Sequence, residues 1–426
     1  MNRPARRRLL RAGAALGSGL LLGATAGGRL QAADGTADGG TGVLGRPRPG
    51  SLWVIHGDGS DTTDLWEEAL AAVGAAGGGA VRATGEHLIS RALTLPDVAR
   101  LEIAGEDGAL LRKADPGREF RIFTAGPPTT PEATLRVRDL QFLGDWDAAP
   151  SMGGDGARCI AVRGYHRVVL RDLTAAAFRN MTFTADDCDE VRVEGCRIDR
   201  SARDPVNLTG SRLVKVTGCS ILNAWDDAIA VHVPRDVTDD ARRWATLIAH
   251  NQILQANGIK VLGGRDISIL GNQVLAANNY GIYLGHDPHW REGGAPHRNV
   301  IVADNIVSEM LAPEYLPGHG RIGCGIFCVD PGRPVLGARI TGNVVTKYKP
   351  SGRGVRFSHW GFGATPAERR LFTADGWIDP ELVYGHQGKG FGIRVICANA
   401  QDERAIAIEN NSFANLGLDI DRKIEG

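Results

Sequence analysis

The sequence has 426 residues, among them 49 basic and 49 acidic side chains. Because these charges balance, no global field attracts the chain to nucleic acid or to an anionic membrane, and we expect neither as a partner. The seven cysteines form no Cys-x-x-Cys pair and no cluster with histidine, which argues against a zinc site and against a disulfide-dense scaffold.

The first segment has the composition of an export signal. Three arginines at positions 6–8 precede an apolar, Gly/Ala-rich run over 12–26. This order indicates a twin-arginine-type signal peptide over residues 1–33, and we therefore expect a secreted or periplasmic protein. The apolar run is too short and too rich in glycine to predict a membrane span.

Residues 34–50 are rich in Gly, Asp and Thr and are predicted to form a flexible linker. The remainder, 51–426, is predicted to be one domain. It opens with a polar turn sequence at 56–63, followed by an amphipathic stretch over 64–76 for which we expect a helix.

Two short strand patterns then alternate along the chain. One has alternating aliphatic residues, then Asn or Cys and another aliphatic residue; copies begin at Val191, Val214, Ile267, Val300, Ala338 and Ile406. The other has a small residue, an aliphatic, a variable and an apolar residue, as in Gly258-Ile-Lys260-Val. Copies recur after about 21 to 33 residues, with no helical pattern between them, which favours a solenoid of short strands.

These repeats predict an all-β, right-handed parallel β-helix with an N-terminal capping helix and long loop insertions. Equivalent positions on successive turns should stack in columns about 4.8 Å apart. The column of Asn251, Asn272, Asn305, Asn343 and Asn411 should form an internal asparagine ladder. Cys196 and Cys219 fall in the same column, where we expect buried apolar fillers.

The segment 57–111, from the polar turn through the expected helix, resembles the N-terminal entry segment of pectate-lyase-superfamily proteins. In that superfamily a helix caps the open end of a right-handed β-helix. The resemblance implies the same arrangement here but implies no particular reaction, and a structural or adhesive solenoid without chemistry shares all these features.

Aligning the second pattern predicts which side chains share the outer face of one sheet. The position two residues before the inward aliphatic residue, where the chain enters each strand, is occupied on successive turns by Arg158, Arg179, Asp204, Asp227, Asn257 and Tyr280, with Asp226 beside Asp227. The outward strand positions read Ala161, Thr182, Asn207, Ala230, Lys260, Tyr283, Phe327, Arg356 and Arg394. Three carboxylates and one ammonium group are thus expected on consecutive turns of one exposed face.

Stacked carboxylates repel one another unless they share a proton or bind a cation. Calcium suits Asp204, Asp226 and Asp227 because it accepts several oxygen ligands in loose geometry. The alternative interpretation is three solvated turn acids and an ordinary exposed lysine.

Asp226-Asp227-Ala-Ile and Asn257-Gly-Ile-Lys260-Val-Leu-Gly-Gly resemble motifs of the calcium-dependent pectate lyases of polysaccharide lyase family nine. The resemblance implies Asp204, Asp226 and Asp227 as calcium ligands and Lys260 as the catalytic base. A further acidic ligand of the family falls on Ala230 here, so the calcium site would be weaker, absent, or rebuilt from Asn207 or Asn223.

The reaction implied is β-elimination beside a uronate, in which a neutral amine removes the C5 proton. An unperturbed lysine has a pKa near 10.4 and is mostly charged at neutral pH, so its surroundings would have to lower that pKa. The expected partner is a polysaccharide rich in uronic acid. We expect the substrate to contact Asn207, Trp225, His232, Tyr280, Tyr283, His286, His289, Arg356 and Arg394.

Two other reactions stay open. His286-Asp-Pro-His289 after a strand resembles the catalytic segment of mannuronan C5-epimerases, which remove and replace the same proton. An Asp one turn before an Asp-Asp pair also resembles polygalacturonase-type glycoside hydrolases, whose carboxylates protonate the leaving oxygen and activate water. Those enzymes also carry an Arg-Ile-Lys strand, which is missing here, and a Gly-His-Gly turn, which occurs only well downstream at 318–320.

Overall fold

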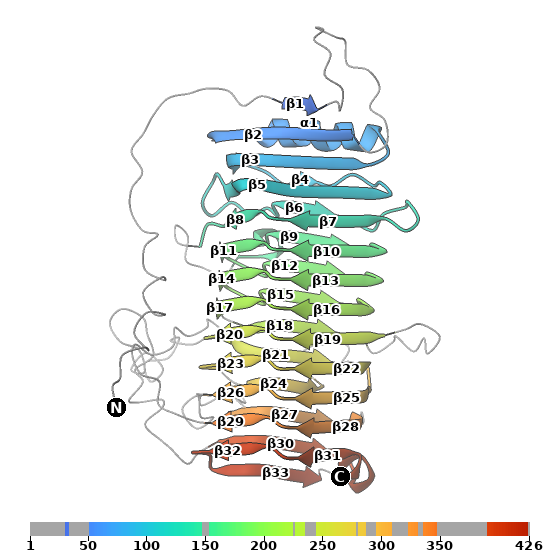
Figure 1. The fold of residues 1–426 in the computed structure, drawn as a ribbon, viewed down its shortest axis with the longest axis vertical. Helices are drawn as coiled ribbons and strands as arrows, with labels where there is room; N and C mark the ends of the chain where they lie inside the picture. The colour runs from blue at the N-terminus through green and yellow to red at the C-terminus, as the bar shows by residue number, and fades with distance from the viewer. Residues whose placement is uncertain are drawn as a thin grey trace, which may run out of the picture.

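The protein is a right-handed parallel β-helix, as the repeats predict (Figure 1). The structure, a computed structural model, describes residues 30–33, 51–146, 153–224, 226–234, 244–277, 280–286, 295–308, 323–330, 335–346 and 390–424. Within these residues no helix has both the length and the apolar character that crossing a membrane requires.

Each turn of the helix contributes strands to three faces. The first face contains β7(Thr134–Arg138), β10(Arg167–Arg171), β13(Glu190–Glu194), β16(Leu213–Thr217), β19(Ala245–Ala249), β22(Gly264–Leu270), β25(His297–Ala303), β28(Val335–Thr341) and β31(Ile406–Glu409). The second contains β8(Gln141–Leu143), β11(Thr174–Phe178), β14(Arg197–Ser201), β17(Ser220–Ala224), β20(Gln252–Leu254), β23(Gln273–Leu275), β26(Ile306–Ser308), β29(Val344–Thr346) and β32(Ser412–Ala414).

The third face is the 11-stranded parallel sheet that carries the candidate site. Its strands are β4(Leu93–Thr94), β6(Phe123–Ala125), β9(Ile160–Arg163), β12(Phe183–Asp186), β15(Val206–Thr209), β18(Asp227–His232), β21(Asn257–Leu262), β24(Tyr280–Gly285), β27(Cys324–Asp330), β30(Phe391–Cys397) and β33(Leu418–Ile424).

Three long strands begin the coil: β2(Ser51–Asp61), β3(Gly79–Ile89) and β5(Arg100–Lys113). β5 pairs with both β7 and β8, so one long strand serves the first and second faces together. β1(Leu30–Ala33), in the stretch where the expected signal peptide ends, pairs antiparallel with β2. Two short helices, η1(Asp155–Ala157) and α4(Ala400–Arg404), complete the described elements.

The capping helix is confirmed as α1(Thr63–Ala75). Its apolar stripe, which includes Trp66, Leu70 and Val73, is buried and covers the open end of the core. The Trp66 ring meets Phe123 edge to face, with 5.6 Å between the ring centroids. Because the end of a solenoid leaves apolar side chains without a next turn, the helix supplies the surface that would otherwise contact water.

The interior is one continuous hydrophobic core of inward-pointing aliphatic residues. The asparagine ladder is confirmed within it: Nδ2 of each of Asn251, Asn272, Asn305 and Asn343 donates to Oδ1 of the next member, ending at Asn411, at 2.9 Å in every case. All seven cysteines are buried and none forms a disulfide, in agreement with the sequence analysis.

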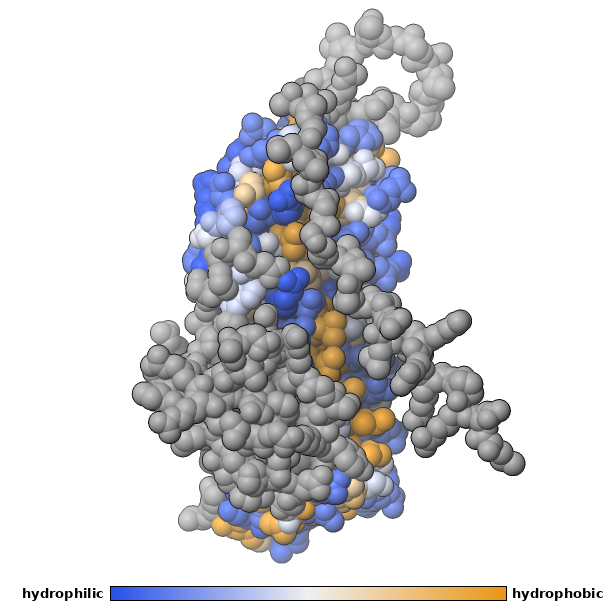
Figure 2. All heavy atoms as spheres, turned by 90° about the vertical axis from the view of Figure 1, so that its left-hand side faces the viewer, coloured by the Kyte–Doolittle hydropathy of each residue, from blue (hydrophilic) through white to orange (hydrophobic). Residues whose placement is uncertain are grey.

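Aliphatic side chains also reach solvent on the second face. Leu254, Ile306 and Val344 are between 37% and 40% exposed, and Figure 2 shows apolar residues gathered in a band along the long axis on this side of the molecule.

Candidate functional site

The third face aligns the predicted outward residues in one column. Asn207 of β15 is in register with Ala230 of β18, and Ala230 with Lys260 of β21. Tyr283 follows on β24, and the column continues through β27 to Arg394 of β30. The predicted positions of Asn207, Lys260, Tyr283 and Arg394 on one face are therefore confirmed.

One part of the predicted alignment was wrong by two residues. Thr184, not Thr182, is in register with Asn207. Phe183 fills the inward position opposite Val206, whereas the sequence analysis made it the last residue of the strand pattern. Thr182 instead donates its hydroxyl to Ser201 at 3.1 Å.

Arg179 was also misplaced by this shift. Its guanidinium lies against Asp145 at 3.5 Å and donates to the carbonyl of Gly117 at 3.1 Å. It therefore belongs to a separate buried ion pair and not to the column of Asp204.

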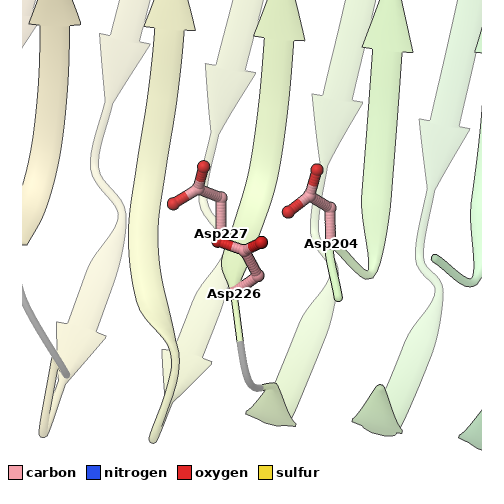
Figure 3. A group of neighbouring side chains, drawn as sticks. All are labelled: Asp204, Asp226 and Asp227. Atoms are coloured by element: carbon pink, nitrogen blue, oxygen red, sulfur yellow. The ribbon is translucent and has the colours of Figure 1, made fainter. Parts of the chain in front are cut away.

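Asp204, Asp226 and Asp227 come together as an acid cluster (Figure 3). Asp204 precedes β15, while Asp226 and Asp227 stand at the start of the neighbouring strand β18. One carboxylate oxygen from each lies within 4.8 Å of the others. Asp204 and Asp227 are 4% and 2% exposed, so the interpretation of three solvated turn acids is wrong for these two.

Asp204 is short of hydrogen-bond partners. Asn207 donates to its Oδ2 at 2.7 Å, but its buried Oδ1 accepts no hydrogen bond from any residue that the structure describes. Burial, reinforced by the negative charges of Asp226 and Asp227, raises the pKa of Asp204 well above its usual range. The cluster thus favours a proton or a cation at this point.

Asp227 is held from the following turns. The hydroxyl of Tyr280 donates to its Oδ1, as does Asn257 Nδ2 at 3.2 Å. Lys260 Nζ lies 3.5 Å from Asp227 Oδ2. The Tyr280 side chain is buried and its hydroxyl is bound to Asp227, so Tyr280 positions Asp227. Burial and the negative charge of Asp227 together raise the pKa of Tyr280 well above 10.

The predicted substitutes for the ligand lost at Ala230 do not complete the cluster. Asn207 presents its amide nitrogen to Asp204, and its oxygen accepts from Thr209 at 3.2 Å. Asn223 donates to Asp199 at 2.8 Å. The oxygen donors that converge are therefore those of the three aspartates.

The other expected substrate contacts are dispersed. Tyr283 and Phe327 pack edge to face within a buried outer cluster, and the Tyr283 hydroxyl donates to the carbonyl of His286. His232 is buried at the end of β18. Arg394 pairs with Asp421 at 3.1 Å. Arg394 lies three strands from Lys260, which at about 4.8 Å per strand is a distance of about 14 Å.

Three expected contacts, Trp225, His289 and Arg356, lie outside the described residues. So do the long insertions predicted at 309–323 and 358–390, apart from their last residues. β27 pairs directly with β30, so no turn intervenes where the sequence analysis placed the strand of Arg356.

Sequence reasoning missed Thr184 and Asp186, which extend the polar surface toward the N-terminus. Both project outward from β12, where Phe183 and Ala185 point into the core. Burial raises the pKa of Asp186 to about 6. The strict alternation of these four residues was the available signal, and the misplaced strand start hid it.

Neither a protein-family model nor a curated protein sequence matches this chain. Solved structures of similar fold include a polygalacturonase from Erwinia carotovora ssp. carotovora, 14% identical over 89% of this chain and 99% of that chain, with a TM-score of 0.48. An exopolygalacturonase from Thermotoga maritima is 12% identical over 87% of this chain and 91% of that chain, with a TM-score of 0.46.

The A-module of a mannuronan C-5 epimerase from Azotobacter vinelandii is 15% identical over 87% of this chain and 97% of that chain, with a TM-score of 0.36. The TM-scores of these three structures are below 0.5, so none of them assigns a reaction or a substrate to this chain.

Proposed function

We propose that the chain is a carbohydrate-active enzyme that cleaves a uronate-containing polysaccharide by β-elimination. The observation that carries the proposal is the convergence of three carboxylates within 4.8 Å, next to an amine, on the outer face of one sheet. Elimination needs a base at the C5 proton and positive charge near the uronate carboxylate. On the third face Lys260 could supply the base, and a cation held by the three carboxylates would supply the positive charge.

The acid cluster fits a calcium ion. Calcium–oxygen distances are about 2.3–2.6 Å, so two oxygens on one ion are at most roughly 5 Å apart, and the three carboxylate oxygens satisfy this limit at 4.8 Å. The buried Oδ1 of Asp204, which accepts no hydrogen bond within the described part of the chain, is an oxygen ligand of the type that calcium binds. Asp204, Asp226 and Asp227 would hold the ion, which when bound would neutralise the substrate carboxylate and so acidify the C5 proton.

Lys260 is the proposed base. Its side chain, 14% exposed, projects outward from β21 beside the cluster. The neutral amine accepts the C5 proton, and the electron pair left on C5 forms the C4–C5 double bond. The glycosidic oxygen leaves C4 with the electron pair of the broken bond and takes a proton from water. The resulting ammonium group lies within 3.5 Å of Asp227 Oδ2, which stabilises it after proton transfer.

Tyr280 and Asn257 support this arrangement by fixing Asp227. Both donate to Oδ1 of that carboxylate, which leaves Oδ2 toward Lys260. Asp227 is thus held by side chains from the following two turns and in turn orients the amine of Lys260, and such positioning of a base is a large part of enzymatic rate enhancement.

We also propose that the protein acts outside the cytoplasm. The arginines at 6–8 followed by an apolar run support export. Export matches the substrate class, because a polymer too large to enter the cell must be cleaved outside it.

Glycoside hydrolysis is the second candidate, and the raised pKa of Asp204 favours it. Burial makes a carboxyl group hold its proton more strongly, and a carboxyl group with a raised pKa is suited to act as a general acid. The carboxylate oxygens lie closer together than the roughly 6.5–9.5 Å between the carboxyl groups of inverting enzymes and nearer the roughly 5–5.5 Å of retaining enzymes, so the spacing argues against inversion but not against hydrolysis.

Product analysis distinguishes these candidates. The protein is incubated with polygalacturonate, alginate and glucuronan, with and without chelator. β-Elimination gives an unsaturated product that absorbs in the ultraviolet and requires calcium; hydrolysis gives new reducing ends without that absorbance. Reducing ends alone, or absorbance unaffected by chelator, would contradict the proposed lyase with a calcium site.

A further inference from the structure

Two adjoining hollows run along the outer surface of the first face, on a different sheet from the acid cluster. One of about 520 Å³ is lined by residues at β5, β7, β10 and β13, and the other, of about 490 Å³, by residues at β13, β16, β19 and β22. Arg192 lines both, so together they form one groove. At about 4.8 Å per strand, the seven strands from β5 to β22 give it a length of roughly 29 Å.

Arginine dominates the N-terminal half of this groove. The first hollow is lined by a single acid, Glu194, and by five arginines: Arg100, Arg136, Arg167, Arg171 and Arg192. The whole chain has equal numbers of basic and acidic side chains, so this is a local concentration of positive charge.

Some of this charge is neutralised within the groove. Arg167 and Arg192 both pair with Glu190 at 2.5 Å, and Glu194 pairs with Lys215 at 2.7 Å. These ion pairs hold the guanidinium groups in fixed positions, which lowers the entropy cost of binding a ligand.

Arg136 is different, because its neighbours leave it without a counter-ion. It is in register between Glu102 of β5 and Val169 of β10, and Glu102 is already bound by Arg138 at 2.9 Å and by Arg82 at 3.3 Å. Within the described residues Arg136 makes no ion pair, and its buried Nε donates no hydrogen bond.

Arg100, which is exposed at the start of β5, likewise makes no ion pair with any described residue. Two guanidinium groups in one hollow therefore lack anionic partners, and a ligand that supplies oxyanions would complete them.

We propose that this groove is a second, non-catalytic binding site for an acidic polysaccharide chain. The planar guanidinium fork matches a carboxylate in bidentate geometry, and an elongated groove accepts a linear polymer along the helix axis. At the other end Leu213, 40% exposed, and Leu247 line the second hollow, where they can contact the apolar faces of sugar rings. The proposal does not depend on which reaction the acid cluster performs.

The charge pattern favours a polyuronate over nucleic acid. Duplex DNA carries one negative charge per about 1.7 Å, many more than the two arginines without ion-pair partners could neutralise along the groove. A polyuronate carries one carboxylate per sugar, which matches arginines that are separated by acids.

The test is direct binding of polygalacturonate to the Lys260→Ala protein, which should not cleave it, measured by calorimetry at two salt concentrations. Changing both Arg100 and Arg136 to Gln should weaken binding about tenfold or more, since charge-assisted hydrogen bonds are lost. The matched control is Arg298→Gln, because Arg298 is also exposed and unpaired among the described residues but lies outside the groove; its affinity should equal the parent's.

Three outcomes would overturn the proposal: unchanged affinity in the double variant, equal binding of a neutral galactan, or displacement of polygalacturonate by duplex DNA. Cleavage of a soluble trigalacturonate by the otherwise native enzyme gives a separate readout, which the two arginine substitutions should leave unchanged. A failure of the lyase proposal would remove the ultraviolet-absorbing product from that assay of the native enzyme but would not affect the binding comparison.

Discussion

Replacing Asp204 by Asn should raise the free energy of unfolding when calcium is removed. The ligand oxygens of the three carboxylates lie within 4.8 Å of one another, and two ionised carboxylates at that separation would repel by about 3.5 kcal/mol at an effective dielectric constant near 20. Proton uptake by Asp204 relieves part of this repulsion, so removing the charge of Asp204 recovers less than the full repulsion energy for each pair. The amide keeps the shape and removes the charge, and we expect a gain of about 1–3 kcal/mol.

The assay is urea denaturation followed by circular dichroism, in chelator and in calcium. Wild-type protein should gain about 2.7 kcal/mol when calcium is at 100 times its dissociation constant, while the Asp204→Asn variant should gain little. Lower stability of the variant in chelator, together with equal stabilisation of both proteins by calcium, would refute the reasoning.

Asp145 provides the matched control for this substitution. Its side chain is 1% exposed, but its oxygens lie 3.9 Å from Lys113 Nζ and 3.5 Å from Arg179 Nη1. Because Asp145→Asn leaves buried positive charges without a counter-ion, it should destabilise the protein by about 3–5 kcal/mol. The same chemical change thus has opposite signs at the two positions.

Two further predictions concern the fold. Asn305→Ala removes the acceptor of Asn272 N–H and the donor to the carbonyls of Ile269 and Ala303, and it should cost about 3 kcal/mol or more in urea denaturation. Gln273→Ala, at an exposed position of β23, should cost under about 0.5 kcal/mol. Burial lowers the pKa of His297 to about 4, so the unfolded chain binds a proton that the folded chain does not between pH 6.5 and 4. Stability should therefore fall by up to about 3 kcal/mol as pH drops through this window; a His297→Gln variant with the same pH dependence would contradict this assignment.

Much of the fold could be predicted because equivalent positions on every turn of a solenoid have the same surroundings and therefore favour the same residue types. Each asparagine of the ladder meets the same backbone groups one strand spacing away, so Asn251 and Asn272 recur in matching sequence patterns. The capping helix was predictable for a similar reason, since an amphipathic stretch at the start of a solenoid covers its open end.

The errors arose where a pattern had two acceptable registers. Phe183 is apolar and satisfied the last position of the strand pattern, but it packs as the first inward residue of β12. Only its pairing with Ile160 and Val206 fixes that choice. Sequence spacing also failed across the long insertions, because β27 pairs with β30 even though 60 residues lie between Asp330 and Phe391.

Within the site, the sequence predicted the acid cluster and Lys260 but not their internal contacts. Tyr280 was expected to bind substrate, yet its hydroxyl reaches Asp227 on an earlier turn. The arginine groove was missed because the sequence analysis followed the inward residues of the first-face strands. Arg136 and Arg192 occupy outward positions, whose shared surface is defined only by the register.

The central claim is that Lys260 removes the C5 proton beside the acid cluster. The most direct measurement is the initial rate of ultraviolet absorbance on the polyuronate that the wild-type protein cleaves, with the Lys260→Ala and Lys260→Arg variants. A positioned base contributes about 10²- to 10⁴-fold, and guanidinium stays protonated at any working pH, so both variants should lose turnover by that factor. Lys260→Arg keeps a positive charge beside Asp227, so its urea midpoint should remain close to wild type. Near-normal turnover in Lys260→Ala, with loss of turnover in Tyr283→Phe or His289→Ala, would place the base on the following turn and contradict the account.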